Sequence, residues 1–174
     1  MTSLTDIKAF AFDVDGVFTG GGILCDVQGE LYRTFDSKDG FGVRMAIMHG
    51  YPVGVITGGR SRSITARFLS SGVPAEDVYL GSRNKMEQLD DFCRRHSVTP
   101  EQVLYIGDDI PDLAVIQAVG IGMCPADAVA EVREAADIVS EFPGGRWCVR
   151  NAIESVMRVQ GTWTFDSMQY KKLF

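Results

Sequence analysis

The sequence predicts an α/β fold in which a parallel β-sheet carries helices on both faces. Short apolar runs rich in β-branched residues alternate with longer segments of helical periodicity. Two of the runs, 52–57 and 103–107, are almost wholly apolar, as strands covered on both faces must be. The 174 residues suit one domain with a substantial core. We therefore expect a single domain over residues 1–174.

Six runs are expected to form the strands, and six segments the helices between them. Thr99 followed by Pro100 is a typical helix start, because threonine caps and proline suits the first helical position. Gly50, Gly72 and Gly120 follow helical segments where a left-handed C-cap is favoured. The expected strands are 7–14, 52–57, 78–80, 103–107, 121–124 and 138–139, and the expected helices are 40–49, 61–71, 84–95, 110–119, 128–136 and 146–159.

One segment, which we name the flap (about residues 18–36), interrupts this alternation. Two apolar runs, 23–25 and 30–35, flank the sequence Asp-Val-Gln-Gly at 26–29, a pattern typical of a β-hairpin with a four-residue turn. The flap should project from the sheet edge at which the first strand ends. Its apolar side chains favour contact with another subunit, with packing onto its own core as the alternative. They are Ile23, Leu24, Leu31, Tyr32 and Phe35.

Composition and charge argue against several classes of function. Seventeen basic residues against 23 acidic ones give a net charge of −6, which disfavours a nucleic-acid partner. The N-terminus lacks the pattern of a signal peptide, and no apolar run is long enough for a membrane span. The four cysteines are scattered, without the spacing of a disulfide framework or metal site. We expect a cytoplasmic protein.

Carboxylates gather where two of the predicted strands end. Because ligands bind outside the carboxyl ends of parallel strands, all five should lie at one rim of the sheet. Each alone could be a helix cap or a turn residue. Together they would raise one another's pKa unless a cation neutralises them, and Mg²⁺ suits aspartate oxygens. They are Asp13, Asp15, Asp108, Asp109 and Asp112.

Four motifs in this order resemble those of the haloacid dehalogenase (HAD) superfamily of phosphohydrolases, whose fold is Rossmann-like. They are Asp13-Val14-Asp15-Gly16, Thr57-Gly58-Gly59-Arg60, Lys85, and Gly107-Asp108-Asp109-Ile110-Pro111-Asp112. The resemblance implies that Asp13 is a nucleophile that forms an aspartyl-phosphate. It implies that Asp15 is the general acid and then the general base.

The same resemblance implies the remaining roles in the site. Asp13, Asp108 and the backbone carbonyl of Asp15 would bind Mg²⁺, with Asp109 and Asp112 orienting groups around it. Thr57 and the Gly58 amide would hold phosphate oxygens. Lys85 would neutralise charge on Asp13 and on the phosphoryl group, which a carboxylate nucleophile needs to approach a phosphate dianion.

Neither gap between these motifs has room for the cap domain that many HAD phosphatases carry. The flap, the segment Lys38-Asp39-Gly40-Phe41-Gly42 and the late Gly144-Gly145-Arg146 resemble the small capless family of 3-deoxy-D-manno-octulosonate 8-phosphate phosphatases. That resemblance implies a homotetramer joined through the flaps, a role in lipopolysaccharide sugar synthesis, and a C-terminal segment (about 144–174) that contacts a neighbouring subunit. The substrate carboxylate would need a basic partner; the candidates are Arg60, Arg146 and Lys38.

Departures from the family pattern leave alternatives open. Trp147 stands where glycine is usual, Asn151 where an acid is usual, and Gly20-Gly21 where Asp-Gly is usual. A nine-carbon sialic-acid 9-phosphate is therefore a second candidate substrate. A non-catalytic oligomerisation module and a phosphatase of macromolecules are candidates from other classes. The tail, 163–174, is expected to be ordered only by contact with something else.

Overall fold

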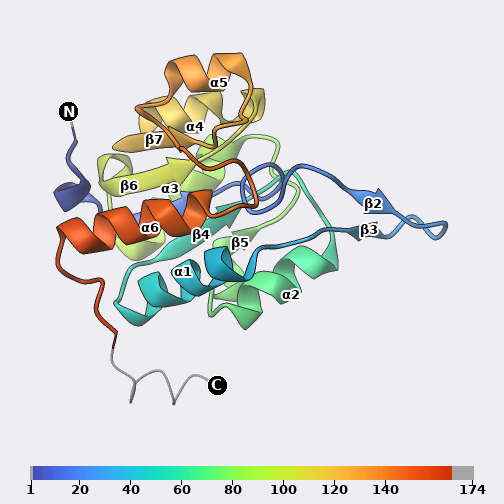
Figure 1. Cartoon of the computed structure of the whole chain (residues 1–174), viewed down its shortest axis with the longest axis horizontal. Helices are drawn as coiled ribbons and strands as arrows, with labels where there is room; N and C mark the ends of the chain where they lie inside the picture. The colour runs from blue at the N-terminus through green and yellow to red at the C-terminus, as the bar shows by residue number, and fades with distance from the viewer. Residues whose placement is uncertain (1, 166–174) are drawn as a thin grey trace.

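A six-stranded parallel sheet runs through the centre of the computed structural model, which describes residues 2–165 (Figure 1). The strand order is β5-β4-β1-β6-β7-β8, and each neighbouring pair is parallel. The fold class expected from the sequence is thus confirmed. The strands are β1 (Ala9–Phe12), β4 (Val53–Ile56), β5 (Val78–Tyr79), β6 (Val103–Ile106), β7 (Ile121–Cys124) and β8 (Ile138–Val139).

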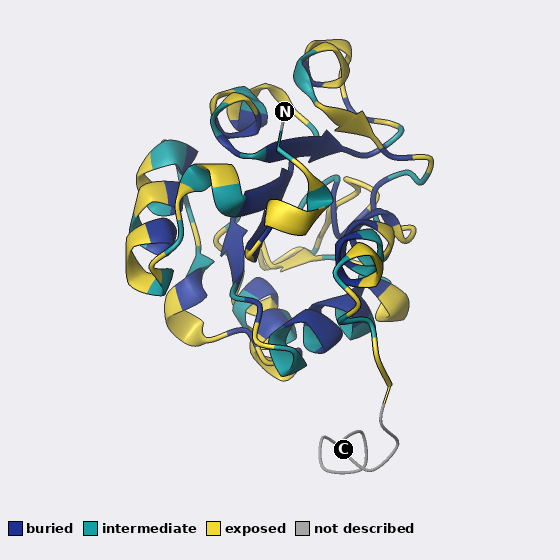
Figure 2. Ribbon diagram, turned by 90° about the vertical axis from the view of Figure 1, so that its left-hand side faces the viewer, coloured by how far each residue is buried: buried dark blue, intermediate teal, exposed yellow. Residues whose placement is uncertain are grey.

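Helices cover both faces of this sheet, and their outward sides are exposed (Figure 2). One face packs on α1, α2 and α6, and the other on α3, α4 and α5. None of the helices within residues 2–165 is long and apolar enough to cross a lipid bilayer. The helices are α1 (Ser37–Met48), α2 (Arg62–Ser70), α3 (Lys85–His96), α4 (Leu113–Ala118), α5 (Ala130–Ala135) and α6 (Cys148–Val159), with 3₁₀ turns η1 (Leu4–Asp6), η2 (Ala75–Asp77), η3 (Pro100–Gln102) and η4 (Ile110–Asp112).

The central strand β1 shows how sequence alternation divides the core into two layers. Phe10 and Phe12 point to the face of α1 and α6, while Ala9 and Ala11 point to the face of α3. Alternate side chains of a strand lie on opposite faces, so large residues fill one layer and small ones leave room for Phe92 of α3 in the other. β1 is thereby fixed at the centre of the sheet, with its carboxyl end leading directly to Asp13.

Most element boundaries differ from the expectation by a few residues, with identifiable causes. Helix α1 begins earlier because Asp36 caps it, accepting hydrogen bonds from the Lys38 and Asp39 amides. Gly50 and Gly72 take positive φ after α1 and α2, as expected. The expectation for Gly120 was wrong: it lies outside the left-handed region, and a Cβ there would lie 1.8 Å from the Glu101 carbonyl oxygen.

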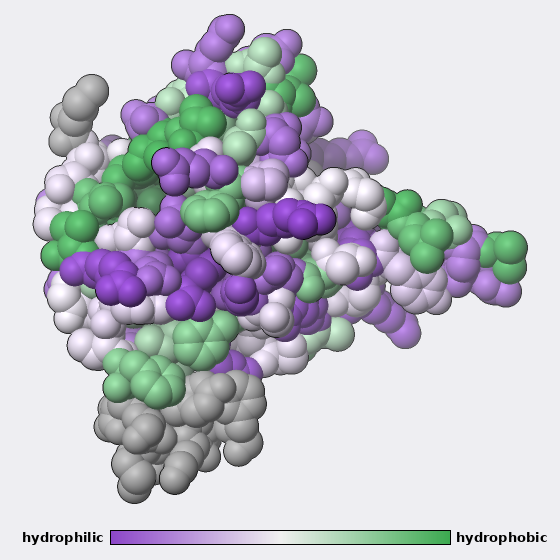
Figure 3. All heavy atoms as spheres, in the orientation of Figure 1, coloured by the Kyte–Doolittle hydropathy of each residue, from purple (hydrophilic) through white to green (hydrophobic). Residues whose placement is uncertain are grey.

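The flap leaves the body of the protein as a two-stranded antiparallel ribbon (Figures 1 and 3). Its strands are β2 (Leu24–Cys25) and β3 (Leu31–Tyr32), and the Asp26 carboxylate closes the turn by accepting the Gln28 and Glu30 amides. Two apolar side chains at the outer end are strongly exposed: Leu24 is 71% and Val27 96% exposed. Of the five apolar flap residues predicted to be at an interface, Phe35, at the base, packs against the core.

Candidate active site

Asp13 begins a tight loop that several glycines make possible. The Asp13 amide continues the sheet by donating to the Ile106 carbonyl at 2.9 Å. Gly16 then takes φ +84°, where a Cβ would lie 1.9 Å from Asp108 Oδ2. Gly144 packs so closely on this loop that a Cβ would lie 1.9 Å from the Gly16 carbonyl oxygen. The late glycine pair therefore supports the loop that carries Asp13 and Asp15.

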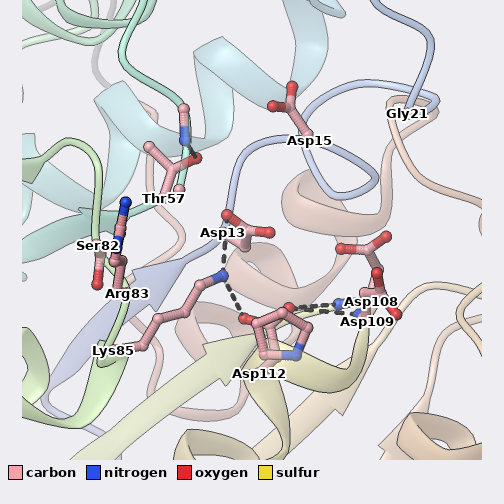
Figure 4. A pocket seen from close by; sticks show the side chains of 13 residues that line it. Asp13, Asp15, Gly21, Thr57, Ser82, Arg83, Lys85, Asp108, Asp109 and Asp112 are labelled. Atoms are coloured by element: carbon pink, nitrogen blue, oxygen red, sulfur yellow. Dashed lines mark hydrogen bonds and ion pairs between the residues drawn. The ribbon is translucent and has the colours of Figure 1, made fainter.

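A cavity of about 520 Å³ opens at the carboxyl ends of β1, β4 and β6 (Figure 4). It brings together the expected catalytic and metal-binding residues, together with Ser82 and Arg83, for which the sequence predicted no role in the site. The lining residues are Asp13, Asp15, Gly21, Thr57, Gly58, Gly59, Ser82, Arg83, Lys85, Asp108, Asp109, Pro111 and Asp112.

Lys85 is the buried cation at the floor of this cavity. Its Nζ lies 3.1 Å from Asp13 Oδ1 and 2.7 Å from Asp112 Oδ1 (Figure 4). Burial lowers the pKa of Lys85, but the two carboxylates outweigh burial and raise it. Burial raises the pKa of Asp13 to about 6, with Lys85 opposing the shift and Asp112 adding to it. Lys85 thus holds the expected nucleophile in place and offsets part of its desolvation.

Asp13, Asp108 and Asp112 form a set of oxygens suited to a metal ion. One carboxylate oxygen from each lies within 4.8 Å of the others. Burial, followed by the charges of Asp13 and Asp112, raises the pKa of Asp108 to about 7. Asp108 Oδ1 is buried and accepts no hydrogen bond from any residue in the described range. An unsatisfied buried carboxylate oxygen among like charges fits a hard divalent cation such as Mg²⁺.

Asp112 has structural partners that the sequence did not reveal. Besides Lys85, it accepts a hydrogen bond from Tyr105 Oη at 2.5 Å and from the amides of Asp108 and Asp109. Burial, then the neighbouring carboxylates, raises the pKa of Tyr105 well above its usual value, so the phenol stays a donor. Asp109 caps η4 through the Ile110 amide, the simpler of its expected roles, while still lining the cavity.

Thr57 and Gly58 follow β4 on the opposite wall. Thr57 is buried, and its Oγ1 accepts the Gly59 amide at 3.0 Å. The Ser82 amide donates to the Thr57 carbonyl at 2.9 Å, which fixes this loop against the segment leading to Lys85. The loop therefore presents a hydroxyl and backbone amides opposite Asp13, as a phosphate site requires.

Comparison with known proteins agrees with this geometry. The sequence pattern of haloacid dehalogenase-like hydrolases matches residues 60–143. The 3-deoxy-D-manno-octulosonate 8-phosphate phosphatase of Salmonella typhi is 33% identical over 161 residues, 92% of this chain and 85% of the relative. This chain belongs to the haloacid dehalogenase-like hydrolases, in the 3-deoxy-D-manno-octulosonate 8-phosphate phosphatase family. The resemblance found in the sequence is confirmed.

Two solved structures extend the comparison. The phosphatase of the same name from Yersinia pestis superposes with a TM-score of 0.88 at 32% identity, covering 91% of this chain and 85% of that one. The one from Moraxella catarrhalis, in complex with a magnesium ion, a phosphate ion and a KDO molecule, has a TM-score of 0.87 at 27% identity, covering 97% and 95%. The acidic cluster of Asp13, Asp108 and Asp112 is consistent with magnesium binding by a HAD fold.

The three basic residues expected to bind the substrate of this HAD protein do not line the cavity at Asp13. Lys38 Nζ lies 3.8 Å from the centre of the Trp147 ring, in a separate pocket. Arg146 lines another pocket beside Asp36, and Arg60 packs beside Gly81. Arg83 does line the cavity. Its position two residues before Lys85 was the feature of the sequence that could have indicated this. Substrate binding by Lys38, Arg60 and Arg146 stays a prediction.

The backbone at Trp147 shows why glycine is usual at this position, and the structure gives no reason for the tryptophan. Its backbone takes φ +79°, a conformation that suits glycine and strains a bulky residue. Helix α6 consequently begins at Cys148, two residues later than expected, and Asp39 of α1 accepts the Trp147 and Arg150 amides. Trp163 packs against the core, while tail residues 166–174 lie outside the described range.

Proposed function

We propose that the protein is a Mg²⁺-dependent phosphatase that hydrolyses 3-deoxy-D-manno-octulosonate 8-phosphate to the free sugar acid and inorganic phosphate, in lipopolysaccharide sugar biosynthesis. The observation that carries the proposal is the buried Asp13, paired with Lys85 at 3.1 Å and adjoining Asp108 in a cavity that Thr57 also lines. The relatives with this name, one of them with bound KDO, support the choice of substrate.

The reaction follows from the positions of these groups. A phosphoryl group between Asp13 and the Thr57 loop would meet hydrogen-bond donors on one side and Lys85 on the other. Asp13 attacks phosphorus and the sugar alkoxide leaves with a proton from Asp15; Asp15 then takes a proton from the water that hydrolyses the aspartyl-phosphate. Asp13 and Asp108 would hold Mg²⁺ together with the Asp15 carbonyl, because Asp112 already accepts hydrogen bonds from Lys85 and Tyr105. The ion would neutralise charge on the phosphoryl oxygens.

The test is a comparison of kcat/KM for eight-carbon and nine-carbon keto-acid phosphates in the presence of Mg²⁺. We expect the eight-carbon substrate to be preferred, and Asp13→Asn to lower kcat by at least about 10³-fold, the scale of losing a covalent nucleophile. Asp90→Asn, an exposed aspartate on α3, is the matched control and should leave kcat unchanged. Preference for the nine-carbon substrate would reassign the substrate, and a blank phosphatase screen would favour a non-catalytic module.

We also propose that the protein is a cytoplasmic homotetramer joined through the flap, with the segment from 144 onward against a neighbouring subunit. The exposed apolar side chains of Leu24 and Val27 support an interface, because monomers rarely leave such a ribbon uncovered. Sedimentation should give a tetramer that Leu24→Glu dissociates and Leu69→Glu, on exposed α2, does not. A wild-type monomer would contradict this arrangement.

A further inference from the structure

Arg33 brings a second buried cation to the site, and it comes from the base of the flap. Its Nε lies 2.6 Å from Asp15 Oδ1 and its Nη2 2.8 Å from Asp15 Oδ2, a two-pronged ion pair across 18 positions of the chain. The Arg33 side chain is 1% exposed, whereas that of Asp15 is 26% exposed. The hydrogen bonds to Asp15 raise the pKa of Arg33, against the effect of burial. The two short hydrogen bonds therefore hold the Asp15 carboxylate in one orientation.

The Arg33 guanidinium also lies against the loop after β4 that carries Thr57, Gly58 and Gly59. A Cβ built on Gly59 would lie 3.2 Å from Arg33 Nη2 and 3.3 Å from Thr57 Oγ1, so Arg33 packs directly on this loop. Its third nitrogen, Nη1, is buried without a hydrogen-bond partner in the described residues. Such a buried donor is costly to leave unpaired. Because burying Arg33 leaves this donor unpaired, a contribution to folding stability does not by itself account for its placement.

Arg33 controls a carboxylate that Lys85 does not reach. Lys85 pairs with Asp13 and Asp112 on the floor of the cavity. The Asp15 carboxylate points away from Asp13 and Lys85 (Figure 4). The two cations thus divide the site: Lys85 serves the nucleophile, and Arg33 orients Asp15. A planar guanidinium fixes both the position and the plane of a carboxylate, which an ammonium cannot do.

We propose that Arg33 is a positioning residue for the acid–base step, so that the flap sets the geometry of Asp15. The inference rests on the proposed phosphatase function. Each Asp15 oxygen accepts one hydrogen bond from Arg33 and retains a second lone pair, on which the catalytic proton is carried. Arg33 touches no reacting atom; it determines where that proton is delivered.

The two half-reactions make different demands on this arrangement. In the first, the bond from Asp13 to phosphorus forms, the phosphorus–ester oxygen bond breaks, and the proton of Asp15 passes to the leaving oxygen. In the second, a water oxygen bonds to phosphorus, its proton passes to Asp15, and the bond to Asp13 breaks. A poor leaving group such as a sugar alkoxide needs the proton in the first half-reaction, whereas 4-nitrophenolate leaves without one.

The test is the leaving-group dependence of Arg33→Met. For the full-length protein with Mg²⁺, kcat/KM for a sugar phosphate should fall about 100-fold, the lower range for general acid catalysis. The kcat/KM for 4-nitrophenyl phosphate, which covers only steps up to departure of the aryl group, should change less than about threefold. Turnover of the aryl substrate should slow after a first burst of product, because Asp15 also serves as the base. Arg33→Lys should fall between wild type and Arg33→Met.

Two controls separate this role from a structural one. Tyr32→Phe removes the flap hydrogen bond from Tyr32 Oη to Asp26 and should leave both kcat/KM values unchanged. In the Asp15→Asn background, Arg33→Met should cause little further loss, because residues that act as a unit are not additive. Equal losses for both substrates, or full additivity with Asp15→Asn, would overturn the inference while leaving the phosphatase intact. A wild-type protein that hydrolyses neither substrate would overturn the proposed function, and this inference with it.

Discussion

Magnesium should stabilise the folded protein strongly at alkaline pH and weakly at acidic pH. In the metal-free fold, burial raises the pKa of Asp13 from 3.8 to about 6 and that of Asp108 from 3.8 to about 7. Both carboxyl groups bind a proton more tightly in the folded state than in the unfolded state. Their contribution to stability is therefore fully present below pH 3.8, and it is lost as the pH rises through about 6 for Asp13 and about 7 for Asp108. Above that range the carboxylates are charged and need a cation.

The magnitude follows from competition between protons and the ion. At about pH 8 and an ion concentration of roughly 100 Kd, binding contributes about 2.7 kcal/mol. For a chain of this size that raises Tm by about 5–10 °C, since 1 kcal/mol corresponds to roughly 2–4 °C. At about pH 5.5, displacing protons from both carboxylates weakens apparent affinity about 100-fold. The same ion concentration then contributes only about 0.4 kcal/mol, or roughly 1 °C.

The assay is thermal unfolding with Mg²⁺ or with chelator at the two pH values, on wild type and on Asp108→Asn. The substitution should abolish most of the Mg²⁺-induced shift at alkaline pH, because it removes the carboxylate whose Oδ1 has no hydrogen-bond partner in the described residues. A shift in Tm of equal size at both pH values would refute the competition argument. A shift that persists in Asp108→Asn would place the ion elsewhere.

Three further substitutions test other parts of the site. Gly16→Ala puts a Cβ 1.9 Å from Asp108 Oδ2, so calorimetric titration should show Mg²⁺ binding lost; binding at wild-type affinity would contradict the loop geometry. Lys85→Met leaves buried Asp13 and Asp112 without their cation and should destabilise the metal-free protein by about 3–5 kcal/mol in chemical denaturation at neutral pH. Asp39→Ala removes the acceptor for the Trp147 and Arg150 amides at the start of α6 and should cost about 1 kcal/mol in the same assay; an unchanged midpoint would contradict the capping role.

The sequence predicted the parallel sheet and most of the cavity because both depend on local patterns. Alternation of Phe and Ala in β1 and the position of Asp13 directly after it are properties of neighbouring residues. The order of motifs then placed Thr57, Lys85 and Asp108 at one edge of the sheet, since parallel strands end together. The structure brings them into one cavity.

What the sequence did not predict depends on contacts between distant segments. Arg33 reads as one residue of an alternating strand, and only the fold brings it to Asp15. Tyr105 reads as a core residue, and only the turn at η4 brings its hydroxyl to Asp112. The sequence predicted that Lys38 and Arg146 bind the substrate, yet in the structure both lie beside Trp147 in separate pockets.

The most direct test of the central claim is to locate the phosphoryl group on the protein. Asp15→Asn, incubated with 4-nitrophenyl phosphate and Mg²⁺, should complete the first half-reaction and stall before the second, because the base is missing. After rapid quenching and digestion, mass spectrometry should find one phosphoryl group, on Asp13. A phosphoryl group on another residue, or 4-nitrophenolate release with no modified peptide, would contradict an aspartyl-phosphate at Asp13.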